Sequence, residues 1–474
     1  MHISLAIIKS YDILPTKWVI VPINSKGGRK CQKITRIASL LARNLLLKIC
    51  ANLIDFLKNI LFSPDFLSRH RQSGKNFIRK RILTFPIMIC ILANILKDAI
   101  QTELKQFFQA LEESDSLEDK VSKAAFCKAR KKLKYSAFLE LNRSLVQFFY
   151  AHFSLMRWRG FRLLAVDGST LKLPNVKEIT DHFGASKGVP MARLSHLYDV
   201  LNKIVVDMVV SPYHVGERKL LAQHRDYFGP NDIVLLDRGY FGFHTFALIL
   251  SRGAHFCARL KIGATKDVKA FYKSGKAESL VTWRPGKDSE EMCHALGLST
   301  KPIMLRLLRV ELENGDVEIL VTSLLDRNLF PRTLFKELYH ARWAIEESYK
   351  RIKCPVKMGT FSGKSVEAIY QDVYAKTFAV NLTAALAHPL QNIVNTRTAE
   401  RKHPYQINFN QALSHMKNIC CRLFGNTNLE NLIAAIHRAF LKALEAARPG
   451  RNFSRKRKKI SSGHVRVTLK EALS

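Results

Sequence analysis

The sequence predicts a mixed α/β protein with a sheet in the middle of the chain and helical segments on both sides. A short apolar run occupies residues 163–166, and two strand-like segments follow at 192–200 and 203–211. A helical segment at 217–227 then leads to a second apolar run at 233–236. This order of strand, strand, strand, helix and strand is typical of a mixed sheet with a helical cover.

The segments around this core differ in their periodicity and charge. The dipeptide Asn314-Gly315 between two strand-like runs predicts a β-hairpin, whereas the segments before residue 155 and after residue 329 repeat their apolar residues at helical spacing. The predicted divisions are an N-terminal basic and apolar extension (1–65), a helical N-terminal region (66–155), the first part of the core (156–262), a β-rich insertion (263–328), a core helix with C-terminal helices (329–447) and a basic tail (448–474).

The charge of the chain indicates what it binds. Its 474 residues include 76 Lys and Arg against 39 Asp and Glu, which gives a net charge of +37. Such a surplus attracts polyanions, so nucleic acid is the predicted partner and a basic membrane-surface protein is the alternative. The basic segment 128–134 fits either a phosphate backbone or an ordinary solvated helix face. Nine cysteines without paired spacing predict buried thiols in a reducing cytoplasm.

Four residues between positions 339 and 353 are predicted to share one face of a helix. We take Tyr339 as the zero of a helix that turns by about 100° per residue. Arg342 then lies at about −60°, Glu346 at about −20° and Lys353 at about −40°. Apolar residues occupy a separate arc of about 80°, so this polar stripe is expected to border the core without entering it. A solvated helix face with paired charges would explain the spacing equally well.

Two aspartates follow the apolar runs of the predicted sheet. Asp167 precedes Gly168 directly, and Asp237 lies two residues before Gly239. Glycine allows a sharp turn, so each carboxylate is expected to emerge at a strand end, although a turn or cap residue is the ordinary explanation. Together with Glu346, three carboxylates could converge, and converging carboxylates need cations between them. Oxygen ligands of this kind select Mg²⁺ or Mn²⁺, which in pairs assist phosphodiester cleavage.

These motifs together resemble those of DDE transposases from bacterial insertion sequences, specifically the insertion-sequence-four family. The resemblance rests on the spacing Tyr-x2-Arg-x3-Glu-x6-Lys of residues 339–353 and on the motifs Asp167-Gly168-Ser169 and Asp237-Arg238-Gly239-Tyr240. It implies an α/β fold with a ribonuclease-H-like catalytic core and a β-rich insertion, between a helical DNA-binding region and C-terminal helices. It also implies a cytoplasmic, nucleoid-associated bacterial protein.

The same resemblance implies a reaction and the residues that perform it. The reaction is cut-and-paste DNA transposition, in which double-stranded DNA is cleaved at inverted-repeat ends and joined to target DNA by a homodimer. The implied cofactor is a pair of Mg²⁺ ions, for which Mn²⁺ can substitute. The implied catalytic residues and metal ligands are Asp167, Asp237 and Glu346. The implied DNA-binding residues are Tyr339, Arg342 and Lys353.

Several other residues have two explanations each. Trp283 could stack on a base flipped out of the DNA, or it could be a core residue of a strand. Glu217 could be a supporting acid of the site, or a carboxylate favoured by a helix start. Asp199 and Asp207 compete with Asp167 for the place of first ligand, although neither precedes a glycine.

Two further functions stay open beside transposition. One is a metal-dependent DNA nuclease that cuts without strand transfer. The other is a catalytically inactive, element-derived DNA-binding protein. The presence of all three acids in the expected order favours an active enzyme.

Overall fold

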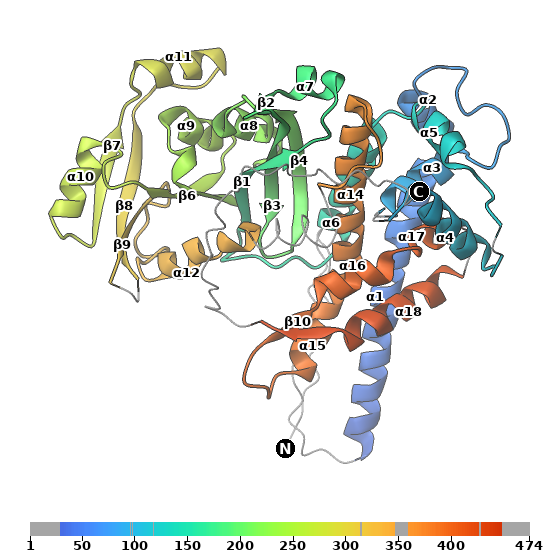
Figure 1. The fold of residues 1–474 in the computed structure, drawn as a ribbon. Helices are drawn as coiled ribbons and strands as arrows, with labels where there is room; N and C mark the ends of the chain where they lie inside the picture. Colours follow the sequence, from blue (N-terminus) through green and yellow to red (C-terminus); the bar gives the residue numbers. More distant parts are fainter. Residues whose placement is uncertain are drawn as a thin grey trace.

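The computed structural model describes residues 29–94, 96, 98–116, 118–312, 315–346, 359–425 and 428–447, with side chains from residue 44 onward. A sheet flanked by helices forms one side of the molecule, and helices from both ends of the chain form the other (Figure 1). The predicted mixed α/β class is therefore confirmed. No helix in the described ranges is long and apolar enough to cross a membrane.

Helices from the first third of the chain form one body. They are α1 (Arg29–Leu61), α2 (Pro64–His70), α3 (Phe85–Ala93), α4 (Ile100–Glu112), α5 (Lys123–Arg130) and α6 (Ser136–His152). The end of α1 belongs to the core of this body, because Leu53, Ile54 and Leu57 are completely buried. Helix α1 also packs against helices α17 and α18 from the end of the chain. The predicted boundary at residue 65 therefore does not separate α1 from the rest of the fold.

The central sheet has the strand order β4-β3-β1-β5-β6-β9-β8-β7, with β2 paired to β3. Strands β1 (Arg162–Lys172), β3 (Val189–Asp199) and β4 (Ile204–Pro212) are antiparallel neighbours. Strands β5 (Asp232–Leu236) and β6 (His255–Leu260) continue the sheet in parallel to β1. The remaining short strand is β2 (Ala185–Ser186). Because β1 and β5 are buried runs in the middle of the sheet, both appear in the sequence as continuous apolar segments.

Helices cover the sheet between its strands. Helix α8 (Glu217–Gln223) packs against β1, β3 and β4, and α9 (Phe243–Ser251) packs against β6 and α8. Helix α7 (Lys177–Phe183) contacts β3 and β4.

The predicted insertion extends this sheet instead of forming a separate one. It contains α10 (Lys266–Lys273), β7 (Glu278–Trp283), α11 (Lys287–Ala295), β8 (Ile303–Glu311) and β9 (Val317–Thr322). Strand β9 pairs with β6 on one side and with β8 on the other. The predicted hairpin joins β8 to β9, and Gly315 has φ +82°, a conformation that favours glycine. Asn314 of that hairpin lies outside the described residues.

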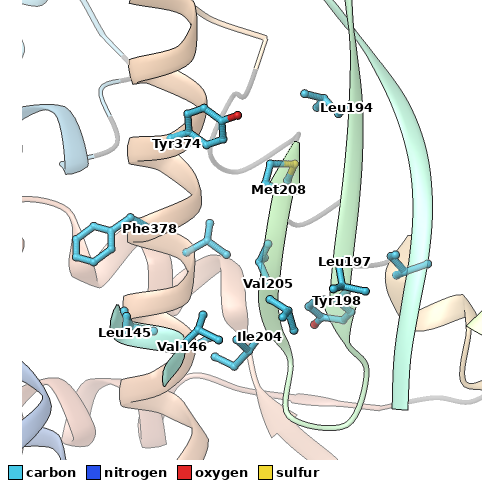
Figure 2. Packing of buried hydrophobic residues seen from close by; sticks show 14 of the residues in the cluster. Leu145, Val146, Leu194, Leu197, Tyr198, Ile204, Val205, Met208, Tyr374 and Phe378 are labelled. Carbon is cyan, nitrogen blue, oxygen red and sulfur yellow. The ribbon is translucent and has the colours of Figure 1, made fainter. Parts of the chain in front are cut away.

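Helix α14 (Val366–Ala387) joins the sheet to the helical body. It packs against α6, α3 and β4, and almost every one of its residues is buried. Figure 2 shows Tyr374 on the side of α14 that faces Met208 of β4, whereas Phe378 lies on the opposite side of the helix. Such a helix has no polar face, so its sequence shows little amphipathic periodicity.

Buried polar groups fix α14 in place. The Asn381 side chain accepts a hydrogen bond from the backbone N–H of Val205 (2.8 Å) and donates one to the Val205 carbonyl (2.7 Å). Both backbone groups of Val205 on the edge strand β4 thus have partners. Arg130 of α5, which is 4% exposed, forms an ion pair with Asp372 at 3.0 Å and donates to Gln371 at 2.6 Å. These contacts hold α5 and the sheet against the same helix.

The chain ends in further helices and a small second sheet. These elements are α12 (Leu334–His340), α15 (Gln391–Arg397), β10 (Tyr405–Ile407), α16 (Phe409–Met416), α17 (Cys420–Phe424), α18 (Leu429–Lys442) and β11 (Leu444–Ala446). The free thiols in the described residues are Cys50, Cys90, Cys127, Cys257, Cys293, Cys420 and Cys421, and all except the half-buried Cys127 are buried.

Candidate active site

Asp167 lies within β1 and not at its end. On the side of β3 the pairing continues past it, with Gly168 opposite Ser195. On the side of β5 the pairing stops at Ala165, which lies opposite Leu235. The predicted sharp turn at Gly168 is therefore wrong, since β1 continues to Lys172 and the φ angle of Gly168 is not positive. Asp167 is accessible because the neighbouring strand ends.

Asp237 directly follows that neighbouring strand. Strand β5 ends at Leu236, and the half-buried Asp237 precedes a short 3₁₀ turn at Arg238–Tyr240. Ala165 lies opposite Leu235 in the parallel pair, and each aspartate comes two residues later in its own strand direction. The carboxyl ends of parallel strands meet at one edge of a sheet, so Asp167 and Asp237 are level with each other there.

The helix that was predicted to carry the polar stripe is interrupted. Helix α12 ends at His340, residues 341–342 form a turn, and helical structure resumes at Trp343. The N–H of Arg342 donates to the carbonyl of Tyr339 (3.0 Å), a bond three residues apart that marks a tighter turn than an α-helix. A single rotation of 100° per residue therefore does not apply from Tyr339 to Glu346.

This interruption buries two residues of the predicted stripe. Tyr339 and Arg342 are each 4% exposed, so the expectation that the stripe borders the core without entering it is wrong for them. The Tyr339 hydroxyl and the Arg342 Nε are buried and have no hydrogen-bond partner among the described residues. The guanidinium of Arg342 lies over the Tyr339 ring, 5.7 Å from its centre. Lys353, the last residue of the stripe, lies outside the described residues.

Arg342 supplies the positive charge among the acids. Its Nη2 lies 3.2 Å from Oε1 of Glu346. Burial lowers the pKa of Arg342, but the neighbouring Tyr339, Asp237 and Glu346 outweigh burial and raise the pKa above its usual value. The guanidinium therefore remains charged and pairs with Glu346, and its charge also acts on Asp167.

Asp167 carries an unfavourable negative charge. Burial raises its pKa from 3.8 to about 6, while the charge of Arg342 and the N–H of Gly168, which donates to Oδ1 at 2.9 Å, act in the opposite direction. The negative charges of Glu217 and Glu346 raise the pKa further. A carboxylate in such surroundings favours an added cation.

Glu217 also belongs to this group of acids. It is the first residue of α8, and its Oε1 lies 3.1 Å from Nη1 of Arg193 on β3. A Cβ atom on Gly168 would lie 2.4 Å from the Glu217 Cδ, so the carboxyl group rests directly on the backbone beside Asp167. This contact joins residues that are far apart in the chain and places Glu217 beside the first aspartate.

Three other residues named from the sequence lie away from this group. Trp283 is 7% exposed, and its ring stacks on that of Phe246 with 6.3 Å between the ring centres. This burial agrees with a core residue of a strand and not with a ring that is open to a DNA base. Asp199 is completely buried and accepts a hydrogen bond from the Tyr150 hydroxyl at 2.9 Å. Asp207 contacts His224 at 2.7 Å.

An exposed aromatic residue beside the acids was not identified from the sequence. Trp343 is 47% exposed, and the guanidinium of Arg342 lies 5.6 Å from the centre of its ring. Trp343 directly follows the turn at residues 341–342 that interrupts the helix. The apolar periodicity of the sequence does not reveal this turn. Among the residues described, this places a large aromatic surface next to the carboxylates.

The donor groups of the site suit a hard divalent cation. All the candidate ligands supply carboxylate oxygens, the type that Mg²⁺ and Mn²⁺ prefer. As the side chains stand, the described residues contain no set of three His, Cys, Asp or Glu side chains close enough to hold a metal ion. Carboxylate rotation would be needed to form such a set.

Comparisons with known proteins agree with this geometry. Residues 158–382 match the family model described as the transposase DDE domain. The chain is 25% identical over 348 residues to transposase InsG for insertion sequence element IS4 from Escherichia coli (strain K12), covering 69% of this chain and 77% of the relative. A solved cryo-EM structure of a piggyBac transposase synaptic complex with hairpin DNA aligns with 86% of this chain and 88% of its own, at 8% identity and a TM-score of 0.42.

The matched segment contains the elements that carry all the acids described above. It begins just before β1 and ends within α14, so it includes β1, β5, α8 and residue 346. Enzymes of this type use a divalent metal, which the carboxylate donors suit. The resemblance to DDE transposases of the insertion-sequence-four family is confirmed by both of these sequence comparisons, which support the function of a DNA transposase.

Proposed function

We propose that this transposase cleaves its DNA ends and joins them to target DNA with Asp167, Asp237 and Glu346 as catalytic metal ligands. The proposal rests on the level arrangement of Asp167 in β1 and Asp237 directly after β5, and on Arg342, which pairs with Glu346 while its charge acts on Asp167. Two Mg²⁺ ions held there would activate the attacking oxygen and stabilise the leaving oxygen of a phosphodiester. Mn²⁺, which accepts the same oxygen ligands, would substitute.

The protein groups have distinct roles in this proposal. Asp167 projects from β1 and Asp237 directly follows β5, so the sheet limits the positions of both carboxylates. Arg342 orients Glu346 through the contact of 3.2 Å between them and limits repulsion among the acids when no metal is bound. Tyr339 supports Arg342 from below, and Lys353 would contact a phosphate of the DNA end.

The core is proposed to be ribonuclease-H-like. Three consecutive antiparallel strands, β1, β3 and β4, precede two strands that run parallel to β1 on its other side. This strand arrangement, with Asp167 in β1 and Asp237 directly after β5, supports the ribonuclease-H-like assignment. A homodimer that holds two DNA ends is part of the same proposal.

A basic surface of the N-terminal helical region is proposed to bind the DNA. The loop after α2 lies beside the end of α5, because Arg71 forms a β-bridge with Leu133 and Gln72 N–H donates to the Lys132 carbonyl at 2.8 Å. Neither 71–84 nor 123–134 contains an acidic residue. The exposed cations of this surface are Lys75, Arg79, Lys80, Arg81, Lys123, Lys128 and Lys131.

The test is cleavage of labelled duplexes that carry the inverted repeats flanking the gene. With Mg²⁺, the wild-type protein should nick these ends and join them to a plasmid. Asp167→Asn, Asp237→Asn and Glu346→Gln should each abolish cleavage and retain end binding, because the phosphate contacts are made elsewhere. Cleavage without joining would instead indicate a nuclease. Tight end binding with no cleavage by folded wild-type protein would indicate an inactive DNA-binding protein.

A further inference from the structure

We propose that Glu217 is a fourth carboxylate of the catalytic metal site, reaching it from the face of β1 opposite to Asp167. The inference rests on the proposed function, because it concerns the same metal site. Adjacent residues of a strand point to opposite faces, so Asp167 and Gly168 face different sides of the sheet. Helix α8, which carries Glu217, packs on the side of Gly168.

Gly168 provides the opening through which Glu217 reaches the site. A Cβ atom at this position would lie 2.4 Å from the Glu217 Cδ and 2.5 Å from its Oε1, closer than non-bonded atoms approach. Gly168 has no positive φ and lies within a regular strand, so its backbone conformation does not require glycine. The glycine is therefore explained by the carboxylate that occupies the place of a side chain.

Gly239 borders the same carboxylate on its other side. A Cβ atom on Gly239 would lie 3.6 Å from Oε2 of Glu217. Gly168 follows Asp167 by one residue, and Gly239 follows Asp237 by two. The carboxyl group of Glu217 thus lies between the backbone segments that carry two of the three proposed metal ligands.

The position of Glu217 is fixed at both ends of α8. At its start, Arg193 of β3 contacts Glu217 at 3.1 Å. At its end, the completely buried His224 contacts the Ser195 hydroxyl of β3 at 2.9 Å and the Asp207 carboxylate of β4 at 2.7 Å. A carboxylate that only interacts favourably with the helix dipole could occupy any position in the first turn, because the dipole acts over that whole turn. It would not need contacts that fix it at one place.

A neighbouring phenol supports the proximity of these acids. Tyr240 is buried, which raises its pKa, and the charges of Glu217, Asp167 and Asp237 raise the pKa further. All three carboxylates therefore lie within electrostatic range of one side chain. Four carboxylates in total, counting Glu346, would balance the charge of two divalent cations.

The first test measures Mn²⁺ binding to the full-length protein without DNA, by electron paramagnetic resonance. Glu217→Gln keeps the shape of the side chain and removes its charge, and it should weaken Mn²⁺ binding by about 10- to 100-fold. Metal-dependent end cleavage should fall in parallel, while end binding in EDTA stays unchanged. Glu290→Gln is the matched control, because Glu290 is an exposed acid in the first turn of α11.

Gly168→Ala provides an independent test. Its Cβ atom would displace the flexible end of Glu217, so this variant should lose Mn²⁺ affinity to a similar extent as Glu217→Gln. Combining the two substitutions should cause no further loss, because both act on one carboxylate. Unchanged thermal unfolding of each variant would show that α8 still packs on the sheet.

Two results would overturn the assignment in different ways. If Glu217→Gln binds Mn²⁺ and cleaves DNA like wild type while Asp167→Asn loses both, Glu217 is not part of the metal site and the proposed function stands. If folded wild-type protein neither binds Mn²⁺ nor cleaves its ends, the proposed function fails, and the role of Glu217 fails with it.

Discussion

Arg342 is the residue whose surroundings differ most from those expected of a helix surface. It is buried beside Tyr339 and pairs with Glu346, and its charge acts on Asp167 and Asp237 as well. A phosphate contact of the kind expected from the sequence would require its guanidinium to reach solvent. In the structure it pairs with Glu346 instead, so in the proposed site its substitution should affect chemistry more than DNA affinity.

Replacing Arg342 by Gln should lower end cleavage by about 10- to 100-fold, because Glu346 loses the partner that orients it. The salt dependence of end binding should not change, since only cations that contact phosphates release counterions. Binding measured at several salt concentrations, together with a cleavage assay, checks both statements. A flatter salt dependence would show that Arg342 contacts the DNA after all.

Asp167→Asn should stabilise the metal-free protein at neutral pH. The folded-state pKa of Asp167, about 6, exceeds its ordinary value of 3.8, so between these pH values the folded state binds more protons than the unfolded state. The contribution of Asp167 to stability is therefore lost as the pH rises through about 6. The gap of about 2 in pKa corresponds to at most about 3 kcal/mol.

Urea unfolding in EDTA at pH 4, 6 and 7.5 measures this effect. The variant should exceed wild type in unfolding free energy at pH 7.5, and the difference should disappear near pH 4. An equal difference at all three pH values would mean that the charge of Asp167 is not its cause.

At the scale of elements, the site depends on where neighbouring elements end. Strand β1 extends past the end of β5, which leaves the Asp167 side of the strand open while β3 still supports it. The turn at residues 341–342 interrupts the helical segment that carries Glu346, whose charge acts on Asp167. Helix α14 holds α5, α6 and β4 together through buried apolar and polar contacts.

Replacing Arg130 by Met should destabilise the fold by about 3–5 kcal/mol, because it leaves the buried Asp372 without its cation. The double variant Arg130→Met with Asp372→Leu should recover part of this loss, since neither charge of the Arg130–Asp372 ion pair remains. Urea unfolding midpoints of the two variants and wild type provide the comparison. A double variant less stable than the single one would show that the ion pair itself is stabilising.

At the scale of the whole molecule, the surplus of 37 positive charges is the dominant property. The basic surface beside α5 combines exposed lysines and arginines from two segments that contain no acid. Because phosphate contacts release counterions, the contribution of this surface should be visible in the salt dependence of binding.

The double variant Lys123→Gln and Lys128→Gln on α5 should flatten the logarithmic salt dependence of end binding by about 1.8, or about 0.9 for each phosphate contact. Lys266→Gln with Lys273→Gln on α10 is the matched control, since both helices have 8 residues and these two lysines are also exposed. An equal change in both pairs would mean that binding follows net charge and not this surface.

The sequence by itself determined the α/β class, the runs that become β1 and β5, the β8–β9 hairpin and the resemblance to DDE transposases. These depend on local periodicity, turn residues and motif spacing, which are present in the chain before it folds. The same local reasoning failed at residues 341–342, because a helix can be interrupted without proline or glycine when tertiary contacts bury its residues.

Only the tertiary structure decided that Asp167 and Asp237 are level, that Arg342 is buried and that Glu217 rests on Gly168. Each of these depends on strand register or on packing between residues distant in sequence. A glycine inside a strand has the same appearance in the sequence whether it serves a turn or a close approach. The partner that fills the space beside it becomes known only from the fold.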